Sequence, residues 1–162
     1  MLDERYGEAP LLTIYGGKIT TYRRLAEDAL ARLAHFFPRS RPWTAHSNLP
    51  GGDFLYDGLS TLIERTQERW KFLTGNHVRR LVSAYGTRVD RVLGGAKSLD
   101  DLGMRLGADL TAAEVRYLMK AEWAQTADDV LWRRSKLGLR FSDAQRADLD
   151  RFMTQAKVAA GA

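Results

Sequence analysis

Signals that start and stop helices recur along the second part of the chain, and they restrict its fold more than any other feature. Three segments begin with Ser or Thr and carry Glu, Asp or Gln three residues later, the pattern that caps the start of a helix: Thr111–Glu114, Thr126–Asp129 and Ser142–Gln145. Gly86 and Gly94 follow two shorter periodic segments, as helix-ending glycines do, and Thr74 or Asn76 is expected to cap the start of the first. After Gly95 we predict a loop through Ser98 and Gly107 with four buried anchors: Leu99, Leu102, Met104 and Leu106. This part of the chain is therefore predicted to form an all-α bundle of about six helices.

The first part of the chain has a different pattern. Residues 11–15 form an apolar run with the length of a buried strand, and Gly16-Gly17 follows directly. From Ile19 onward apolar residues recur with the helical period until Pro38, which ends the helix. We therefore predict a mainly α chain in which one strand and one long helix precede the helical bundle.

Residues 38–57 separate these two parts. They contain three of the four prolines and a glycine pair, and they have no sustained period, which is typical of a connection between structural units. We assign residues 1–37 to a first unit, residues 38–57 to the connection and residues 58–162 to an all-helical domain. Trp43 and Leu49 are expected to pin the connection to a surface, because a free linker would not need them.

The composition excludes several kinds of site. The 162 residues include no cysteine, so disulfides, thiolate metal sites and a cysteine nucleophile are excluded. His35, His46 and His77 have no metal-ligand spacing and no paired carboxylate close in sequence, and we predict no metal site. The net charge of +5 allows an anionic partner, but interleaved acids and bases favour ordinary surface solvation, and nucleic acid is not the expected partner. No apolar run approaches the roughly 20 residues that span a bilayer.

Two charged clusters receive structural interpretations. Arg79 and Arg80, with Arg88 and Arg91 downstream, could touch phosphate in a helix-turn-helix, but no clear recognition helix follows. We therefore predict that these arginines are solvated. In residues 128–135 an acidic start and a basic end match the helix dipole, which favours a structural helix over a ligand site.

The turn at Gly16-Gly17 has the strongest chemical character in the chain. The P-loop pattern fails because Leu12 and Ile19 occupy the positions of its first glycine and its Ser or Thr. The dinucleotide fingerprint G-x-G-x-x-G is also absent. What remains is a glycine pair that lets a planar or anionic group approach the backbone, beside the positive charge of Lys18.

The start of the helix supports the same interpretation. Thr20 and Thr21 add hydroxyl groups in the first turn, while Arg23 and Arg24 stand where capping acids would be. The backbone N–H groups at the positive end of the helix dipole are then left for an external acceptor. On the spacing alone, a tight strand-to-helix turn with an exposed Lys18 stays open as the alternative.

Residues 12–27, Leu-Thr-Ile-Tyr-Gly-Gly-Lys-Ile-Thr-Thr-Tyr-Arg-Arg-Leu-Ala-Glu, resemble the Gly-Gly-Lys-x-Thr-Thr-Tyr-Arg segment of the FAD-dependent aerobic glycerol-3-phosphate dehydrogenases. In that family the segment is the last strand-to-helix element of the flavin-binding domain. Further segments extend the resemblance over nearly the whole chain, with Ser135 in place of the usual Thr: Leu49–Gly52, Tyr85–Gly86, Glu114–Trp123 and Asp128–Gly138.

The resemblance implies an oxidoreductase that converts sn-glycerol 3-phosphate to dihydroxyacetone phosphate and passes electrons through FAD to membrane quinone. It implies a cofactor-binding turn over Gly16, Gly17, Lys18, Ile19, Thr20 and Thr21. The backbone N–H groups from Gly17 to Thr20 would face flavin N1 and the C2 carbonyl, and Lys18 would lie close to the flavin and the substrate. The helical domain would pack against the catalytic body, or serve a homodimer or membrane contact. The enzyme would be cytoplasmic and peripheral on the inner face of the cytoplasmic membrane.

The missing dinucleotide fingerprint indicates that the chain is a C-terminal fragment of a longer enzyme, without the N-terminal catalytic body. We expect the fragment alone to bind no FAD and to have no dehydrogenase activity. The alternative is a stand-alone helical interaction module that binds an anionic partner, nucleic acid or a membrane surface, in a salt-sensitive manner.

Overall fold

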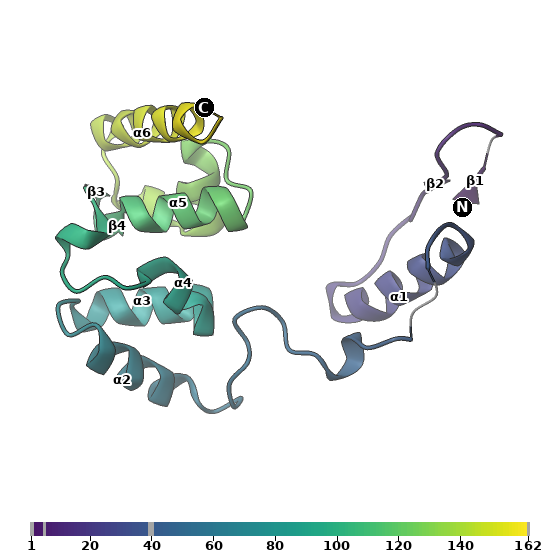
Figure 1. Ribbon diagram of the computed structural model, residues 1–162, viewed down its shortest axis with the longest axis horizontal. Helices are drawn as coiled ribbons and strands as arrows, with labels where there is room; N and C mark the ends of the chain where they lie inside the picture. Colours follow the sequence, from purple (N-terminus) through teal and green to yellow (C-terminus); the bar gives the residue numbers. More distant parts are fainter. Residues whose placement is uncertain (1, 5, 39–40, 162) are drawn as a thin grey trace. The chain divides into compact units, whose positions relative to one another are not determined.

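The computed structural model describes residues 2–4, 6–38 and 41–161, with side chains described up to residue 159 (Figure 1). The chain divides into two compact units, residues 1–48 and residues 49–162. Helices predominate among the described residues, which confirms the mainly α prediction. Each unit is described by itself below.

The first unit begins with a short antiparallel pair, in which β1 (Leu2–Asp3) lies beside β2 (Leu11–Leu12). After an extended stretch the chain enters the 3₁₀ turn η1 (Ile19–Thr21) and helix α1 (Tyr22–Arg32). Two further 3₁₀ turns follow, η2 (Ala34–Phe36) and η3 (Thr44–His46).

Both predicted elements of this unit are shorter than expected. The strand predicted over residues 11–15 has two residues, because β1 is its one ladder partner among the described residues and is itself two residues long. The helix predicted from Ile19 to Pro38 is an α-helix for eleven residues only, with 3₁₀ turns at either end. Its apolar face is largely open, with Ile19 88% and Leu30 60% exposed.

The expectation that Trp43 and Leu49 are pinned to a surface is wrong within this chain. Their exposed fractions are 66% and 62%. Trp43 belongs to the first unit and Leu49 begins the second, and neither side chain is buried by the described residues of its own unit.

The second unit is helical, as predicted. Its helices are α2 (Leu59–Arg69), α3 (Gly75–Tyr85), α4 (Val89–Leu93), α5 (Ala112–Ala121), the π-helix η6 (Asp129–Arg134) and α6 (Asp143–Gly161). Three 3₁₀ turns connect them: η4 (Gly86–Arg88), η5 (Asp100–Leu102) and η7 (Leu137–Arg140).

A small hairpin, β3 (Arg105–Gly107) and β4 (Leu110–Thr111), lies where the sequence predicts only a loop. Of the four residues expected as buried anchors of that loop, Leu102 and Leu106 are buried, whereas Leu99 and Met104 are 41% and 60% exposed.

The predicted helix caps are present. Thr74 Oγ1 accepts a hydrogen bond from the backbone N–H of His77, and Thr111 Oγ1 accepts one from that of Glu114. The backbone N–H of Gln145 donates to Ser142 Oγ at 3.3 Å, and the backbone N–H of Ser142 donates to Gln145 Oε1 at 3.0 Å. These two bonds form the capping box of α6. These short-range bonds explain why helix starts could be predicted from the sequence.

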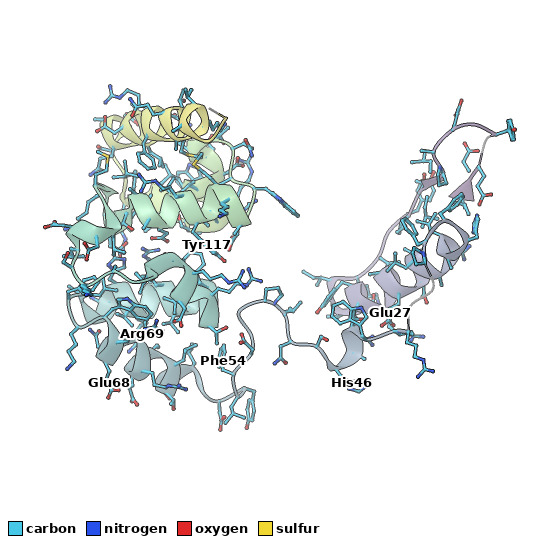
Figure 2. All side chains as sticks on the ribbon, viewed as in Figure 1. Glu27, His46, Phe54, Glu68, Arg69 and Tyr117 are labelled. Carbon is cyan, nitrogen blue, oxygen red and sulfur yellow. The ribbon has the colours of Figure 1, made fainter. Side chains whose placement is uncertain are left out.

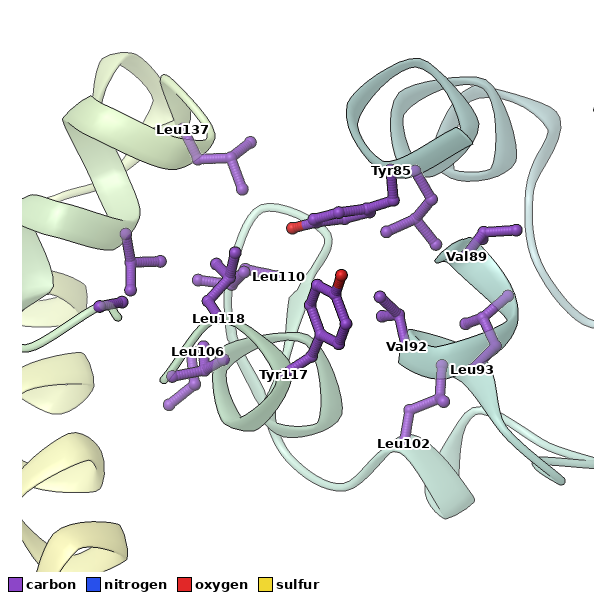
Figure 3. Packing of buried hydrophobic residues seen from close by; sticks show 14 of the residues in the cluster. Tyr85, Val89, Val92, Leu93, Leu102, Leu106, Leu110, Tyr117, Leu118 and Leu137 are labelled. Atoms are coloured by element: carbon purple, nitrogen blue, oxygen red, sulfur yellow. The ribbon is translucent and has the colours of Figure 1, made fainter. Parts of the chain in front are cut away.

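The core of the second unit extends from the end of α2 through α3, α4, α5 and the hairpin to η6 and α6, and Figure 3 shows its central part. Tyr85 from α3 and Tyr117 from α5 meet edge to face at its centre, with ring centroids 5.4 Å apart and planes at 79°. Leucine and valine side chains surround the two rings: Val89, Val92, Leu93, Leu102, Leu106, Leu110, Leu118 and Leu137. This packing fixes α3 against α5, the two helices that carry the buried polar residues described next.

Candidate functional site

The predicted cofactor turn, residues 16–21, is a glycine corner that leads into η1. Gly16 and Gly17 have φ of +78° and +121°, values that side chains with a Cβ rarely adopt. Lys18 is extended, and its carbonyl accepts hydrogen bonds from the N–H and Oγ1 of Thr21 at 3.0 and 3.1 Å. All of these residues are exposed, and among the described residues no side chain caps the start of η1 or α1. The turn therefore presents uncapped N–H groups at its surface.

The connecting segment is attached to α1 through Glu27. Its Oε1 accepts hydrogen bonds from Thr44 Oγ1 at 2.6 Å and from Arg23 Nη1 at 2.8 Å. The hydrogen bond from Thr44, followed by the charge of Arg23, holds the pKa of Glu27 below its usual value. Figure 2 shows Glu27 on α1 and His46 on the segment that it anchors. This contact lies within the first unit. It holds the connecting segment against α1 and is not part of a reactive site.

The second unit contains a fully buried carboxylate, Glu114, with no exposed side-chain surface. Its Oε1 accepts hydrogen bonds from Arg80 Nη1 and Tyr85 Oη, both at 2.7 Å, and its Oε2 accepts one from Arg80 Nη2 at 2.7 Å. Arg80 Nε also lies 2.9 Å from Asp109 Oδ1 in the turn of the hairpin. One guanidinium thus joins α3, α5 and the hairpin.

The prediction that Arg80 is solvated is wrong, since its side chain is only 16% exposed. Burial alone would lower the pKa of Arg80, but the hydrogen bonds and charge of Glu114 raise it. Burial, together with the charge of Glu114, raises the pKa of Tyr85. The sequence gives no local signal for this network, because its partners lie 29 and 34 residues apart.

His77 lies beside this network at the start of α3. It is 6% exposed, and its Nε2 has no hydrogen-bond partner among the described residues. Burial lowers the pKa of His77; the charges of Asp109 and Glu114 oppose that shift, while those of Arg80 and Arg105 add to it. Folding therefore favours the neutral form of His77.

A neutral buried histidine makes stability depend on pH. The unfolded chain binds a proton at His77 below a pKa of about 6.5, whereas the folded chain resists it, so stability is full above that pH and falls below it. Between pH 6.5 and 5 we expect His77→Gln to flatten the slope of unfolding free energy by up to ~1.4 kcal/mol per pH unit. Urea unfolding at several pH values measures this. The exposed control His46→Gln should keep the slope of the parent, and an equal slope in both variants would contradict the expectation.

Two segments that carry the family resemblance meet in the structure. Thr87 N donates a hydrogen bond to Gly51 O at 3.1 Å, which brings Leu49–Gly52 against Tyr85–Gly86. A Cβ added at Gly86 would lie 1.9 Å from Gly51 O, and one added at Gly51 would lie 2.4 Å from Tyr85 O. Both glycines are therefore required by this close backbone contact.

The Asp-Asp-x-Leu-x-Arg-Arg segment is also structural. Asp129 Oδ2 accepts hydrogen bonds from the backbone N–H groups of Gln125 and Thr126. Asp129 Oδ1 pairs with Arg133, four residues later, at 3.0 Å. Arg134 donates two hydrogen bonds to Glu122 O. The segment caps its own π-helix and ties it to the end of α5.

Comparison with known proteins identifies what these units belong to. Residues 42–158 match the family described as the C-terminal domain of alpha-glycerophosphate oxidase. The chain belongs to this family. A glycerol-3-phosphate dehydrogenase of Pseudomonas aeruginosa is 48% identical over 91% of the chain and 29% of its own length. The aerobic glycerol-3-phosphate dehydrogenase of Escherichia coli is 37% identical over 95% of the chain and 31% of its own length. A D-erythritol 1-phosphate dehydrogenase of Brucella abortus is 40% identical over 98% of the chain and 32% of its own length.

These matches confirm the resemblance to the C-terminal part of such dehydrogenases. The chain spans about a third of the length of the curated relatives it matches. Among the residues of this chain that the structure describes, no helix is both long enough and apolar enough to cross a bilayer. The described residues also include no group of three or more His, Asp or Glu side chains that could hold a metal ion.

Proposed function

We propose that this chain is the C-terminal part of an FAD-dependent dehydrogenase that oxidises sn-glycerol 3-phosphate to dihydroxyacetone phosphate and passes the electrons to quinone. The observation that carries the proposal is the 48% identity to a glycerol-3-phosphate dehydrogenase over 91% of the chain. The relative that acts on D-erythritol 1-phosphate supports the wider substrate class, a polyol with a terminal phosphate.

The turn at residues 16–21 fits a role at the flavin. Its uncapped backbone N–H groups suit the ring atoms N1 and the C2 carbonyl oxygen, and a Cβ at Gly16 would meet nothing within 4 Å, so a planar ring can approach. Bound FAD would accept the hydride of the substrate. The chain's own part is electrostatic: donors fixed before the reaction, together with Lys18, would stabilise the negative charge that develops on the reduced ring.

The helical unit would pack against the catalytic body or serve a dimer or membrane contact, with the whole enzyme peripheral on the cytoplasmic membrane. One wall of a flavin pocket supplies few of the contacts that hold the cofactor, so the 162-residue chain alone should bind no FAD and oxidise no substrate. A stand-alone module that binds an anionic partner is the alternative. Membership of the oxidase C-terminal family favours the enzyme.

The test uses the full-length enzyme, purified with its flavin. Glycerol 3-phosphate added without oxygen should bleach the flavin absorbance, and a soluble quinone should restore it. Comparing kcat/KM for glycerol 3-phosphate and D-erythritol 1-phosphate decides the substrate. A flavin that stays oxidised with both substrates would overturn the proposal, and yellow colour in the isolated 162-residue chain would overturn the account of the fragment.

Lys18→Met in the full-length enzyme tests the turn. We expect kcat to fall about tenfold, equivalent to ~1.4 kcal/mol, while the flavin content stays near one per chain. Arg32→Met is the matched control, because Arg32 is an exposed cation at the end of α1 in the same unit. If both variants retain full kcat, Lys18 has no role at the flavin.

A further inference from the structure

Helices α5 and α6 lie side by side in the second unit and leave a groove of about 950 Å³ between them (Figure 1). Its floor is apolar. Ala124 is fully buried beneath it, and Met119, Phe152 and Ala156 are half-buried along it. A hollow of this size with an apolar floor is large enough for a ligand rather than for solvent alone.

The rim of the groove is positively charged. Arg116 and Lys120 lie on α5 and Lys157 lies on α6, and the described residues that line the groove include no acid. The Arg116 guanidinium lies over the Phe152 ring, 5.3 Å from its centroid, and Lys157 Nζ donates to Gln125 O at 2.7 Å. In the part of the chain that the structure describes, none of these three cations pairs with a carboxylate. The groove therefore has unused positive charge beside an apolar surface.

The spacing of the cations limits what can neutralise them. Contact of Arg116 with Phe152 marks one end of the groove, and contact of Lys157 with Gln125 marks the other. Phe152 and Lys157 are five residues apart on α6, so at a helical rise of 1.5 Å per residue these ends are roughly 7.5 Å apart. Lys120 follows Arg116 by about one turn of α5. A helix that carries acids every three or four residues presents them roughly 5–6 Å apart, which matches this spacing of the cations.

We propose that this groove binds an acidic amphipathic helix of a partner protein. The apolar face of that helix covers Met119, Phe152 and Ala156, and its acids meet the cations along the rim. The exposed charges accelerate association and make it salt-dependent, while burial of the apolar floor supplies most of the affinity. The groove shares no residue with the turn at residues 16–21, and the proposal does not rest on the proposed reaction.

The probe is a labelled synthetic peptide of about five helical turns, with leucine on one face and glutamate on the other. A scrambled peptide of the same composition, without an apolar face, is its control. By fluorescence anisotropy at low salt, the 162-residue chain should bind the amphipathic peptide at least about tenfold more tightly than the scrambled one. Equal binding of the two peptides would overturn the proposal.

Charge reversal locates the site. K120E with K157E should weaken binding of the amphipathic peptide at least about tenfold. K71E with K97E changes the same charge at two exposed lysines outside the groove and should leave the affinity unchanged. Equal weakening by both pairs would mean that net charge alone attracts the peptide. Sedimentation with phosphatidylglycerol vesicles completes the test: vesicle binding that depends on Lys120 and Lys157, without peptide binding, would assign the groove to a membrane surface and overturn the proposal.

Discussion

Glu114→Ala should destabilise the helical unit by about 3–5 kcal/mol, because it leaves the guanidinium of Arg80 buried without its main counter-charge. The hydroxyl of Tyr85 loses its acceptor at the same time. Urea unfolding of the 162-residue chain, followed by circular dichroism, measures the loss. Arg79→Ala removes an exposed cation next to Arg80 and should change stability by less than about 0.5 kcal/mol.

Two further variants keep this expectation testable if Glu114→Ala fails to fold. Tyr85→Phe removes only the hydroxyl donor and should cost about 1 kcal/mol. Combining Glu114→Leu with Arg80→Met removes both charges, and the double variant should be more stable than either single one. If the loss of stability in the double variant equals the sum of the losses in Glu114→Leu and Arg80→Met, then Arg80 and Glu114 do not act as a buried pair.

Gly86→Ala should destabilise the same unit by about 3–5 kcal/mol, through backbone strain and overpacking together. Gly86 has φ of +54° and ψ of −134°, and its Cβ would overlap Gly51 O at 1.9 Å. The backbone of Leu49–Gly52 must move away, which also breaks the hydrogen bond from Thr87 to Gly51. The loss is again measured by urea unfolding.

Gly94 offers a control with nearly the same backbone. It ends α4 with φ of +55° and ψ of −131°, but a Cβ there would meet nothing within 4 Å. Gly94→Ala therefore reports the strain alone, about 1–3 kcal/mol, and the excess in Gly86→Ala reports the contact with Gly51. If Gly86→Ala and Gly94→Ala lose the same free energy of unfolding, the backbone at Gly51 moves away from the added Cβ without a measurable loss of stability.

The Arg80–Glu114 pair and the contact between Gly51 and Gly86 explain what the segments that carry the family resemblance do in the second unit. Leu49–Gly52 and Tyr85–Gly86 form one backbone contact. Glu114, in the first turn of α5, neutralises Arg80 from α3. Asp129 and Arg134 fix the π-helix. Each of these residues holds the helical unit together, so the resemblance there reflects folding, and the chemistry proposed for the chain lies in residues 16–21.

Much of the fold follows from the sequence because helix caps are local. Thr74, Thr111 and Ser142 bond to backbone groups three residues away, and such bonds form wherever the helix starts. The glycine pair at Gly16-Gly17 could be recognised for the same reason, since the backbone there depends on adjacent residues. The hairpin at residues 105–111 was missed because its strands are too short to give a period.

The sequence by itself determined the family, the mainly α class, the helix starts and the glycine turn, all of which rest on neighbouring residues. Only the tertiary structure decided that Arg80 is buried, that Gly51 and Gly86 touch, and that α5 and α6 enclose a cationic groove. The free energy of a buried charge depends on the partners that the fold brings within hydrogen-bond distance. For Arg80 that partner is Glu114, 34 residues along the chain, and no local pattern connects the two.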